Sequence, residues 1–239
     1  MKLKLIVILG FLFLVSQAHA QETPVLKNQK DKVSYIIGMD IGNNLKKQSI
    51  DVDPNILAKG VKDALSGAKS LLTEKEIQET MGAFQKEMMV KKEEVGKQNK
   101  KEGETFLAEN KKKEGVKTSP SGLQYKVIKA GSGKKPKSID TVTVHYRGTL
   151  INGTEFDSSY KRGQSVSFQV SGVIPGWTEA LQLMEEGAKW QLFIPSNLAY
   201  GERGAGGAIG PNATLIFEVE LVSIQEKKEN QSEKPAPKK

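Results

Sequence analysis

The chain has no cysteine among its 239 residues. Disulfides, thiolate catalysis and cysteine-ligated zinc are therefore excluded together. Histidine is nearly as scarce, because His19 lies in the first twenty residues and leaves His145 as the only other one. His145 lies in a predicted strand between Val144 and Tyr146, and the alternation points it away from their face, so we expect neither a serine-histidine triad nor a histidine metal site. We therefore expect no cofactor and no metal.

The sequence also has no domain in which charges of one sign clearly dominate. The formal net charge is +8, but the stretch from Thr118 to Gln225 contains 10 bases and 9 acids. Because nucleic-acid-binding proteins gather their bases on one face, we expect no nucleic-acid partner. Weak attraction to an anionic membrane surface stays open.

No apolar run is long enough to span a bilayer, which needs about 20 residues. The run at residues 5–15 follows Lys2 and Lys4 and precedes the small-residue site Ala18-His19-Ala20. This layout predicts a secretory signal peptide at residues 1–20 and an exported protein. The alternative is an uncleaved amino-terminal anchor. A cysteine-linked lipid anchor is excluded.

Residues 21–72 have a helical pattern. A second helix should begin at the Asp53-Pro54 cap and end at Ser66-Gly67. The first helix carries an apolar stripe at four-residue spacing: Val33, Ile37, Ile41 and Leu45. Two short helices cannot form a convincing core alone, so we expect a dimerisation region and a homodimer. The alternative is that the stripes pack on the carboxy-terminal domain.

Residues 73–117 predict one long helix. Its first part should belong to the dimerisation region, and the rest should act as a spacer. It should open at Thr73 with a capping box to Glu76. Its apolar stripe is Ile77, Met81, Phe84 and Met88, and after Val95 the sequence becomes polar. Gly96 and Gly103 each weaken a helix by about 1 kcal/mol, so a bend or break stays open.

After Gly115 the apolar pattern changes to period two. The strands that it predicts span residues 123–128, 141–150, 165–170, 190–194 and 214–224. Asn152-Gly153 marks a hairpin, and Thr178–Glu186 can form one short helix ended by Gly187. An antiparallel sheet packed on one helix is an α+β domain. The lysine- and proline-rich residues 226–239 predict a disordered tail.

Aromatic and apolar residues gather beside the predicted turns of this domain, as in VIPGW at residues 173–177 and AYG at 199–201. They fit either an ordinary core or an apolar pocket with few polar groups. The glycines at 204, 206 and 207 precede no phosphate-binding lysine, so they indicate a mobile loop.

Five ordered blocks between Thr118 and Gln225 resemble the FKBP family of prolyl isomerases. They are VHYRGTL, GTEFDSSY, VIPGWTEAL, PSNLAYGERGAGG and IGPNATLIFEVELVSI. The preceding residues, among them KVSYIIGMDIGNNL and LTEKEIQETMGAFQKEM, are similar to the macrophage infectivity potentiator proteins. Those relatives are exported homodimers in which amino-terminal helices associate and long helices hold two isomerase domains apart.

The resemblance implies an FKBP-like α+β fold at residues 118–225, with an antiparallel sheet wrapped on a short helix. It implies catalytic roles for Asp157, Tyr200 and Tyr146. The implied substrate-binding residues are Phe156, Val166, Val173, Ile174, Trp177, Ile209 and Phe217.

Within that set, Trp177 would form the floor for the proline ring, and Tyr200 and the Ile174 N–H would bind substrate carbonyls. Asp157 would face the twisting amide, positioned by Tyr146 and Arg162. Tacrolimus and rapamycin would occupy the same pocket. Many relatives have an aromatic residue at the position of Val166 and a histidine at that of Ala205, which bears on substrate preference.

The implied function is acceleration of Xaa-Pro isomerisation in folding proteins, in the periplasm or outer membrane of a Gram-negative bacterium. The partners would be proline-containing polypeptides. A dry pocket suits this reaction, since twisting an amide crosses a barrier of about 18–20 kcal/mol without breaking a bond. The alternatives are a folding chaperone with incidental catalysis and a surface virulence factor, such as an adhesin that uses the helices.

Overall fold

The computed structural model of the chain describes residues 26–226. The expected signal peptide, and the expected tail apart from Glu226, lie outside the described residues. The helices are α1 (Gln29–Lys47), α2 (Pro54–Ser66), α3 (Glu74–Asn110) and α4 (Pro175–Leu183), with short 3-10 turns at Val170–Gly172, Ser196–Leu198 and Gly201–Arg203. The strands are β1 (Val116–Thr118), β2 (Gln124–Lys129), β3 (Thr141–Leu150), β4 (Glu155–Ser158), β5 (Val166–Gln169), β6 (Lys189–Ile194) and β7 (Leu215–Gln225).

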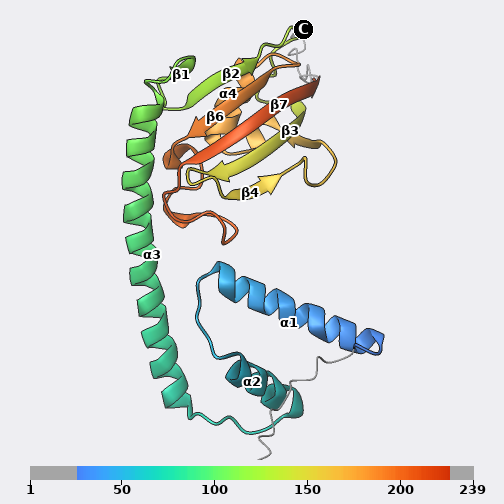
Figure 1. Cartoon of the computed structure of the whole chain (residues 1–239), viewed down its shortest axis with the longest axis vertical. Coiled ribbons are helices and arrows are strands. Elements are labelled where there is room, and N and C mark those ends of the chain that lie inside the picture. The colour runs from blue at the N-terminus through green and yellow to red at the C-terminus, as the bar shows by residue number, and fades with distance from the viewer. Residues whose placement is uncertain (1–25, 227–239) are drawn as a thin grey trace, which may run out of the picture. The chain divides into compact units, whose positions relative to one another are not determined.

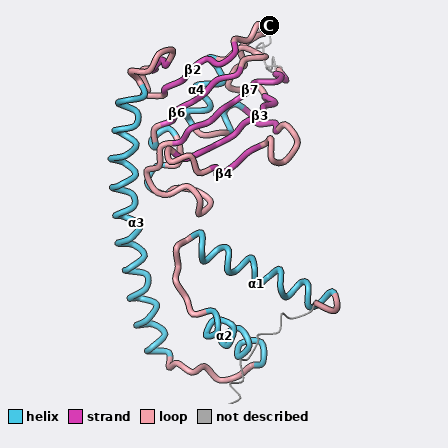
Figure 2. The backbone as a smooth tube through the Cα atoms, in the orientation of Figure 1, coloured by secondary structure: helices cyan, strands magenta, loops and turns pink. Residues whose placement is uncertain are grey.

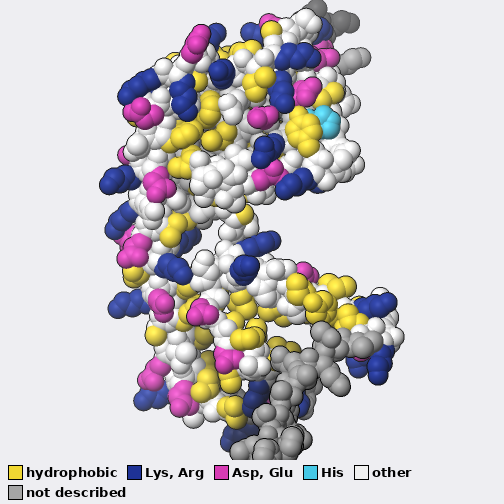
Figure 3. All heavy atoms as spheres, viewed as in Figure 1, with side chains coloured by type: hydrophobic (Ala, Val, Ile, Leu, Met, Phe, Trp, Pro, Cys, Tyr) yellow, Lys and Arg dark blue, Asp and Glu magenta, His cyan; other side chains and the backbone are white. Residues whose placement is uncertain are grey.

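The described residues divide into two compact units between residues 46 and 47, and the first unit contains nearly all of α1. None of the helices between residues 26 and 226 is both long and apolar enough to cross a lipid bilayer. Helices α1 and α2 bury no residue. Figure 3 shows apolar side chains of the amino-terminal helices at the surface.

The predicted helix ends are confirmed where side chains cap the backbone. Asp53 accepts hydrogen bonds from the N–H groups of Asn55 and Ile56, and Gly67 closes α2 in the left-handed conformation. Thr73 and Glu76 form the complete capping box at the start of α3. These contacts satisfy backbone groups that a helix end leaves without partners.

Helix α3 differs from the expected spacer. It is one continuous helix of 37 residues, so Gly96 and Gly103 do not break it. Both glycines and Asn110 are buried, and Phe106 lies 6.0 Å from Phe193 of β6, ring centre to ring centre. The polar half of α3 therefore packs on the sheet domain, where glycine lets the backbones approach closely (Figure 1).

The carboxy-terminal domain has an α+β fold with an antiparallel sheet (Figures 1 and 2). The strand order is β1-β2-β6-β7-β3-β4, and β5 also pairs with β3. Strand β3 is shared along its length, because residues 141–144 pair with β5 and residues 147–149 pair with β4. Helix α4 packs on the sheet through Trp177, Ala180 and Leu181, which are buried in the main apolar core.

Most strands fall where the alternation predicts them, and β3 has the predicted bounds. The short helix does not, since it begins at Pro175 and ends at Leu183 rather than spanning Thr178–Glu186. Proline at the first helical position favours that earlier start. Strands β1 and β4 are three and four residues long, too short to show an alternation of their own.

Two leucines on α4 differ in burial, so substituting each one tests which face of the helix packs in the core. Leu181 is fully buried, whereas Leu183 is 38% exposed. Leu181→Ala should lower the free energy of unfolding by about 2–5 kcal/mol, and Leu183→Ala by less than about 1 kcal/mol. Urea unfolding followed by tryptophan fluorescence measures this domain alone, because both tryptophans, Trp177 and Trp190, lie in its core. Equal losses would contradict the packing of α4.

Candidate active site

A cavity of about 610 Å³ opens between α4, the sheet and the loops before β7. That size is usual for a small-ligand pocket. Its walls are mostly aromatic and aliphatic. The lining residues are Tyr146, Phe156, Asp157, Phe168, Gly172, Val173, Ile174, Trp177, Tyr200, Ala205, Gly206, Ala208, Ile209 and Phe217.

Nine of the ten residues expected at the site line this cavity. The tenth, Val166, packs against the core beside it, and Phe168 of the same strand lines the wall instead. Residues two apart on a strand face the same side, so the alternation around Val166 could have pointed to Phe168. Ala205, which stands where many relatives have a histidine, does line the cavity.

The pocket floor and walls are rings that meet edge to face. The Trp177 ring lies 5.3 Å from Tyr146 at 88° and 5.2 Å from Phe217 at 83°. Phe156 meets Phe217 at 5.4 Å and 83°, and Phe168 meets Trp177 at 6.0 Å and 82°. Such pairs add about 0.5–1.5 kcal/mol each beyond the area that they bury. The rings hold one another at angles that keep the cavity open.

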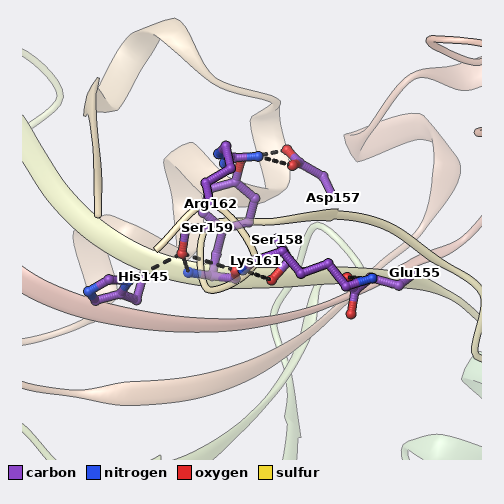
Figure 4. Close-up of polar contacts among 8 residues, drawn as sticks. His145, Glu155, Asp157, Ser158, Ser159, Lys161 and Arg162 are labelled. Atoms are coloured by element: carbon purple, nitrogen blue, oxygen red, sulfur yellow. Dashed lines mark hydrogen bonds and ion pairs between the residues drawn. The ribbon is translucent and has the colours of Figure 1, made fainter. Parts of the chain in front are cut away.

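A closed set of hydrogen bonds lies at the rim, and Figure 4 shows one side of it, between Arg162 and Asp157. The Tyr146 hydroxyl donates to Asp157 Oδ2 at 2.5 Å. Arg162 donates through Nη2 to the Tyr146 hydroxyl at 2.7 Å and through Nη1 to Asp157 Oδ1. The Arg162 guanidinium also lies 5.4 Å from the centre of the Tyr146 ring. Each of the three side chains therefore contacts the other two.

These contacts fix the charge of the rim. Burial acts to raise the pKa of Asp157, but hydrogen bonds from Tyr146 and Arg162 outweigh it and hold the pKa below the usual value of 3.8. Burial raises the pKa of the Tyr146 hydroxyl, and the bond to Asp157 raises it further. At neutral pH the pocket therefore has a carboxylate and a protonated phenol at its rim.

Ser159 holds the Tyr146 backbone from the other side. Its hydroxyl accepts from the Tyr146 N–H at 2.8 Å, and its own N–H donates to the Tyr146 carbonyl at 2.9 Å. His145 points to the opposite face, as the alternation predicts, where its ring stacks on Tyr160 at 5.1 Å. Figure 4 shows His145 apart from the Arg162–Asp157 pair.

Two lining residues of the cavity, Ile174 and Tyr200, have hydrogen-bond donors. Among the described residues, the Ile174 N–H, at the start of α4, donates to no backbone carbonyl. Tyr200 lines the cavity and is 40% exposed. The Trp177 indole is only 4% exposed, and its Nε1 has no hydrogen-bond partner among the residues described. The site can thus hold an apolar ring below and carbonyl groups above.

Known proteins share this architecture. The family model described as FKBP-type peptidyl-prolyl cis-trans isomerase matches residues 132–222, and that of the domain amino terminal to it matches residues 30–127. The outer membrane protein MIP of Legionella longbeachae is 50% identical over 231 residues, which cover 94% of this chain and 99% of that protein. The peptidyl-prolyl cis-trans isomerase Mip of Coxiella burnetii is 47% identical over 220 residues, 90% of this chain and 95% of that protein.

Among solved structures, that of FkpA from Escherichia coli matches with a TM-score of 0.60 and 43% identity, and covers 84% of this chain and 99% of that chain. Together the family models, the relatives and the pocket agree on one class. The chain belongs to the FKBP-type peptidyl-prolyl cis-trans isomerases, with an amino-terminal domain like that of the Mip proteins.

The rim contacts predict how Asp157 titrates. Arg162→Gln removes a hydrogen bond and a positive charge from the carboxylate, so the pKa of Asp157 should rise. Lys161→Gln is the matched control, because Lys161 pairs with Glu155 at 2.8 Å instead. Carboxyl-carbon NMR during an acid titration measures both. Equal shifts in the two variants would mean that only distant charge acts on Asp157.

Proposed function

We propose that this isomerase acts on Xaa-Pro bonds of exported proteins as they fold, and that the aromatic cavity is where the bond twists. The observation that carries the proposal is the cavity itself: an apolar floor and walls with a carboxylate, a phenol and a free backbone N–H at the rim. Proline-containing polypeptides are then the substrates.

The physical basis is the amide itself. Isomerisation removes amide resonance, and the planar amide is the more polar and better hydrated form, so a dry pocket weakens the ground state more than the twisted state. Donors fixed at the rim add binding that is stronger in the transition state. No bond is broken, so no nucleophile is needed. Within residues 26–226, no group of three or more His, Cys, Asp or Glu is placed to hold a metal.

Each rim residue has a proposed role. Trp177 is the floor for the proline ring, and the Tyr200 hydroxyl and Ile174 N–H bind substrate carbonyls. Asp157 faces the twisting amide, and Tyr146 and Arg162 position it. Their places in the lining support these roles, except for Arg162, whose role is supported by its hydrogen bonds to Asp157 and Tyr146. Tacrolimus- and rapamycin-type inhibitors would occupy the same space.

The proposed organisation follows the five segments of the chain. They are a signal peptide at 1–20, a helical dimerisation region at 21–72, a long helix at 73–117, the isomerase domain at 118–225 and a disordered tail at 226–239. A homodimer is supported by uncovered apolar stripes, because Val33, Ile37 and Ile41 are 39–54% exposed. Two isomerase domains in one molecule would hold an unfolded chain at two points, which raises effective concentration.

The proposed location is the periplasm or outer membrane of a Gram-negative bacterium. The amino-terminal signal pattern supports export. One relative is named an outer membrane protein.

Two substitutions test the rim. Asp157→Ala and Tyr200→Phe should each lower kcat/KM for a proline tetrapeptide about fivefold or more, since each removes a polar contact to the substrate, worth about 1 kcal/mol. Tyr160→Phe is the control, because Tyr160 is 45% exposed and bonds Glu220 outside the cavity. A protease-coupled assay on the mature chain measures the rates, with tacrolimus as competitor.

The same variants separate catalysis from chaperone binding. If Asp157→Ala loses peptide isomerisation but still assists refolding of a proline-limited protein, the chain acts mainly as a binding module. If both rim variants match the control in a folded state, their proposed roles are wrong.

The stripe on α1 predicts the oligomeric state. The mature chain should sediment as a dimer at micromolar concentration, and Ile37→Asp should shift it toward the monomer by placing a charge in an apolar interface. Asn43→Asp adds the same charge to an exposed position on the other side of α1 and should leave the dimer intact. Sedimentation equilibrium is the measurement. A wild-type monomer would contradict the proposed dimer.

A further inference from the structure

The polar half of α3 contacts the loops that form the pocket, and no proposed role yet accounts for this. Gly96, Gly103 and Asn110 are spaced seven apart, which places them on one face of the helix, and all three are buried. A side chain added at Gly103 would collide with Thr214, just before β7. One added at Gly96 would lie 3.4 Å from Pro211 and Asn212. The helix backbone thus sits directly on residues 211–214.

Two asparagines hydrogen-bond across this contact, one from the helix and one from residues 211–214. Asn99 of α3 donates through Nδ2 to the Pro211 carbonyl at 2.8 Å. In return, Asn212 donates through Nδ2 to the Gly96 carbonyl at 3.4 Å. We call Asn99 and Asn212 the amide clamp. Asn212 has a φ of 55°, a left-handed conformation that asparagine tolerates better than most residues.

The clamp lies at the base of the pocket loop, residues 204–209. Ala205, Gly206, Ala208 and Ile209 of this loop line the cavity. Ala205 and Ile209 exchange backbone hydrogen bonds at 2.8 and 3.0 Å, which closes the loop on itself. Gly210 follows at once, and a side chain there would lie 3.0 Å from Asn99 Nδ2. The end of the loop is therefore in contact with α3.

The clamp also reaches the other side of the loop. The backbone N–H of Asn212 donates to the Gly201 carbonyl at 2.8 Å, and Gly201 follows Tyr200 in the chain. The segment from Tyr200 to Ile209 contains four glycines, so its own sequence gives it little rigidity. One helix contact thus fixes both ends of the segment that carries Tyr200 and Ile209.

At the far end of the docked half, a second set of contacts holds α3 on the sheet. Asn110 donates to the Gln124 side chain of β2 at 3.0 Å, and Gln124 donates to the Leu107 carbonyl at 2.9 Å. The helix is therefore anchored to the sheet independently of the clamp. Loss of the clamp would free the pocket loop without releasing α3.

We infer that Asn99 is a positioning residue for prolyl isomerisation: through the amide clamp, α3 holds the pocket loop and Tyr200 where they contact the substrate. The docked half of α3 then belongs to the catalytic unit rather than to a passive spacer. This inference rests on the proposed function, because it takes the cavity as the place where the Xaa-Pro bond binds. It adds that the pocket is completed by a helix outside residues 118–225.

The test uses the full mature chain and an isosteric substitution. Asn99→Asp keeps the shape but replaces the amide donor with a carboxylate that faces the Pro211 carbonyl. Gln98→Glu makes the same amide-to-acid change on the neighbouring residue, which is exposed and bonds only Glu102. We expect Asn99→Asp to lower kcat/KM for a proline tetrapeptide about fivefold, the effect of one lost hydrogen bond. The loss should appear mainly as a higher KM, because the loop contacts substrate throughout the reaction.

A second pair of variants acts through shape instead of charge. Gly103→Ala places a methyl group against Thr214 and should also raise KM, whereas Gly82→Ala meets nothing within 4 Å on the same helix. Adding Thr214→Ala to Gly103→Ala removes the hydroxyl in the way and should restore part of the loss. If either Asn99→Asp or Gly103→Ala fails to fold, the kinetic constants of the other variant test the inference.

Urea unfolding by tryptophan fluorescence accompanies each assay. A higher KM at an unchanged unfolding midpoint supports positioning. Kinetic constants of Asn99→Asp equal to those of Gln98→Glu would overturn the inference, and so would a loss of rate no larger than the loss of folded protein. A wild-type chain without isomerase activity would instead overturn the proposed function on which the inference rests.

Discussion

The edge-to-face contacts of Trp177 are the interaction on which the rest of the structure depends. One indole on α4 contacts Tyr146 of β3, Phe168 of β5 and Phe217 of β7. Strand β3 pairs with both β5 and β7, so the indole packs across three neighbouring strands and holds α4 on that part of the sheet. The same rings leave a cavity too apolar to stabilise a hydrated amide. The same aromatic side chains therefore pack the core and line the cavity.

The cavity has few polar groups at its rim, and hydrogen bonds hold them in place. Hydrogen bonds from Tyr146 and Arg162 keep Asp157 charged. The Ser159 hydroxyl accepts a hydrogen bond from the Tyr146 backbone N–H and so fixes that backbone. The pocket loop has no such internal support beyond its Ala205–Ile209 pair. Its further support comes from α3, whose polar half contacts residues 211–214 directly after the loop.

Features set by residues close together in the sequence, such as helix caps and strand bounds, were predictable. Contacts between segments far apart in the sequence were not. The caps at Asp53 and Thr73 and the bounds of β3 follow from side-chain hydrogen bonds and alternation within a few residues. The five blocks located nine of the ten expected pocket residues. Phe168 was missed because resemblance pointed to Val166, two residues earlier. The docking of α3 was missed because glycine and asparagine in a polar stretch normally indicate solvent, and only the opposing Pro211–Thr214 segment explains them.

The central claim is that this cavity lowers the barrier to rotation about an Xaa-Pro bond. Exchange NMR on a proline tetrapeptide tests it without any coupled protease. Uncatalysed exchange takes tens to hundreds of seconds at 25 °C, so a mixing time of about one second gives no cis–trans cross-peaks. With a small molar fraction of the mature chain, cross-peaks should appear, and tacrolimus should abolish them. A folded chain that produces no cross-peaks, or cross-peaks that tacrolimus leaves unchanged, would contradict the account.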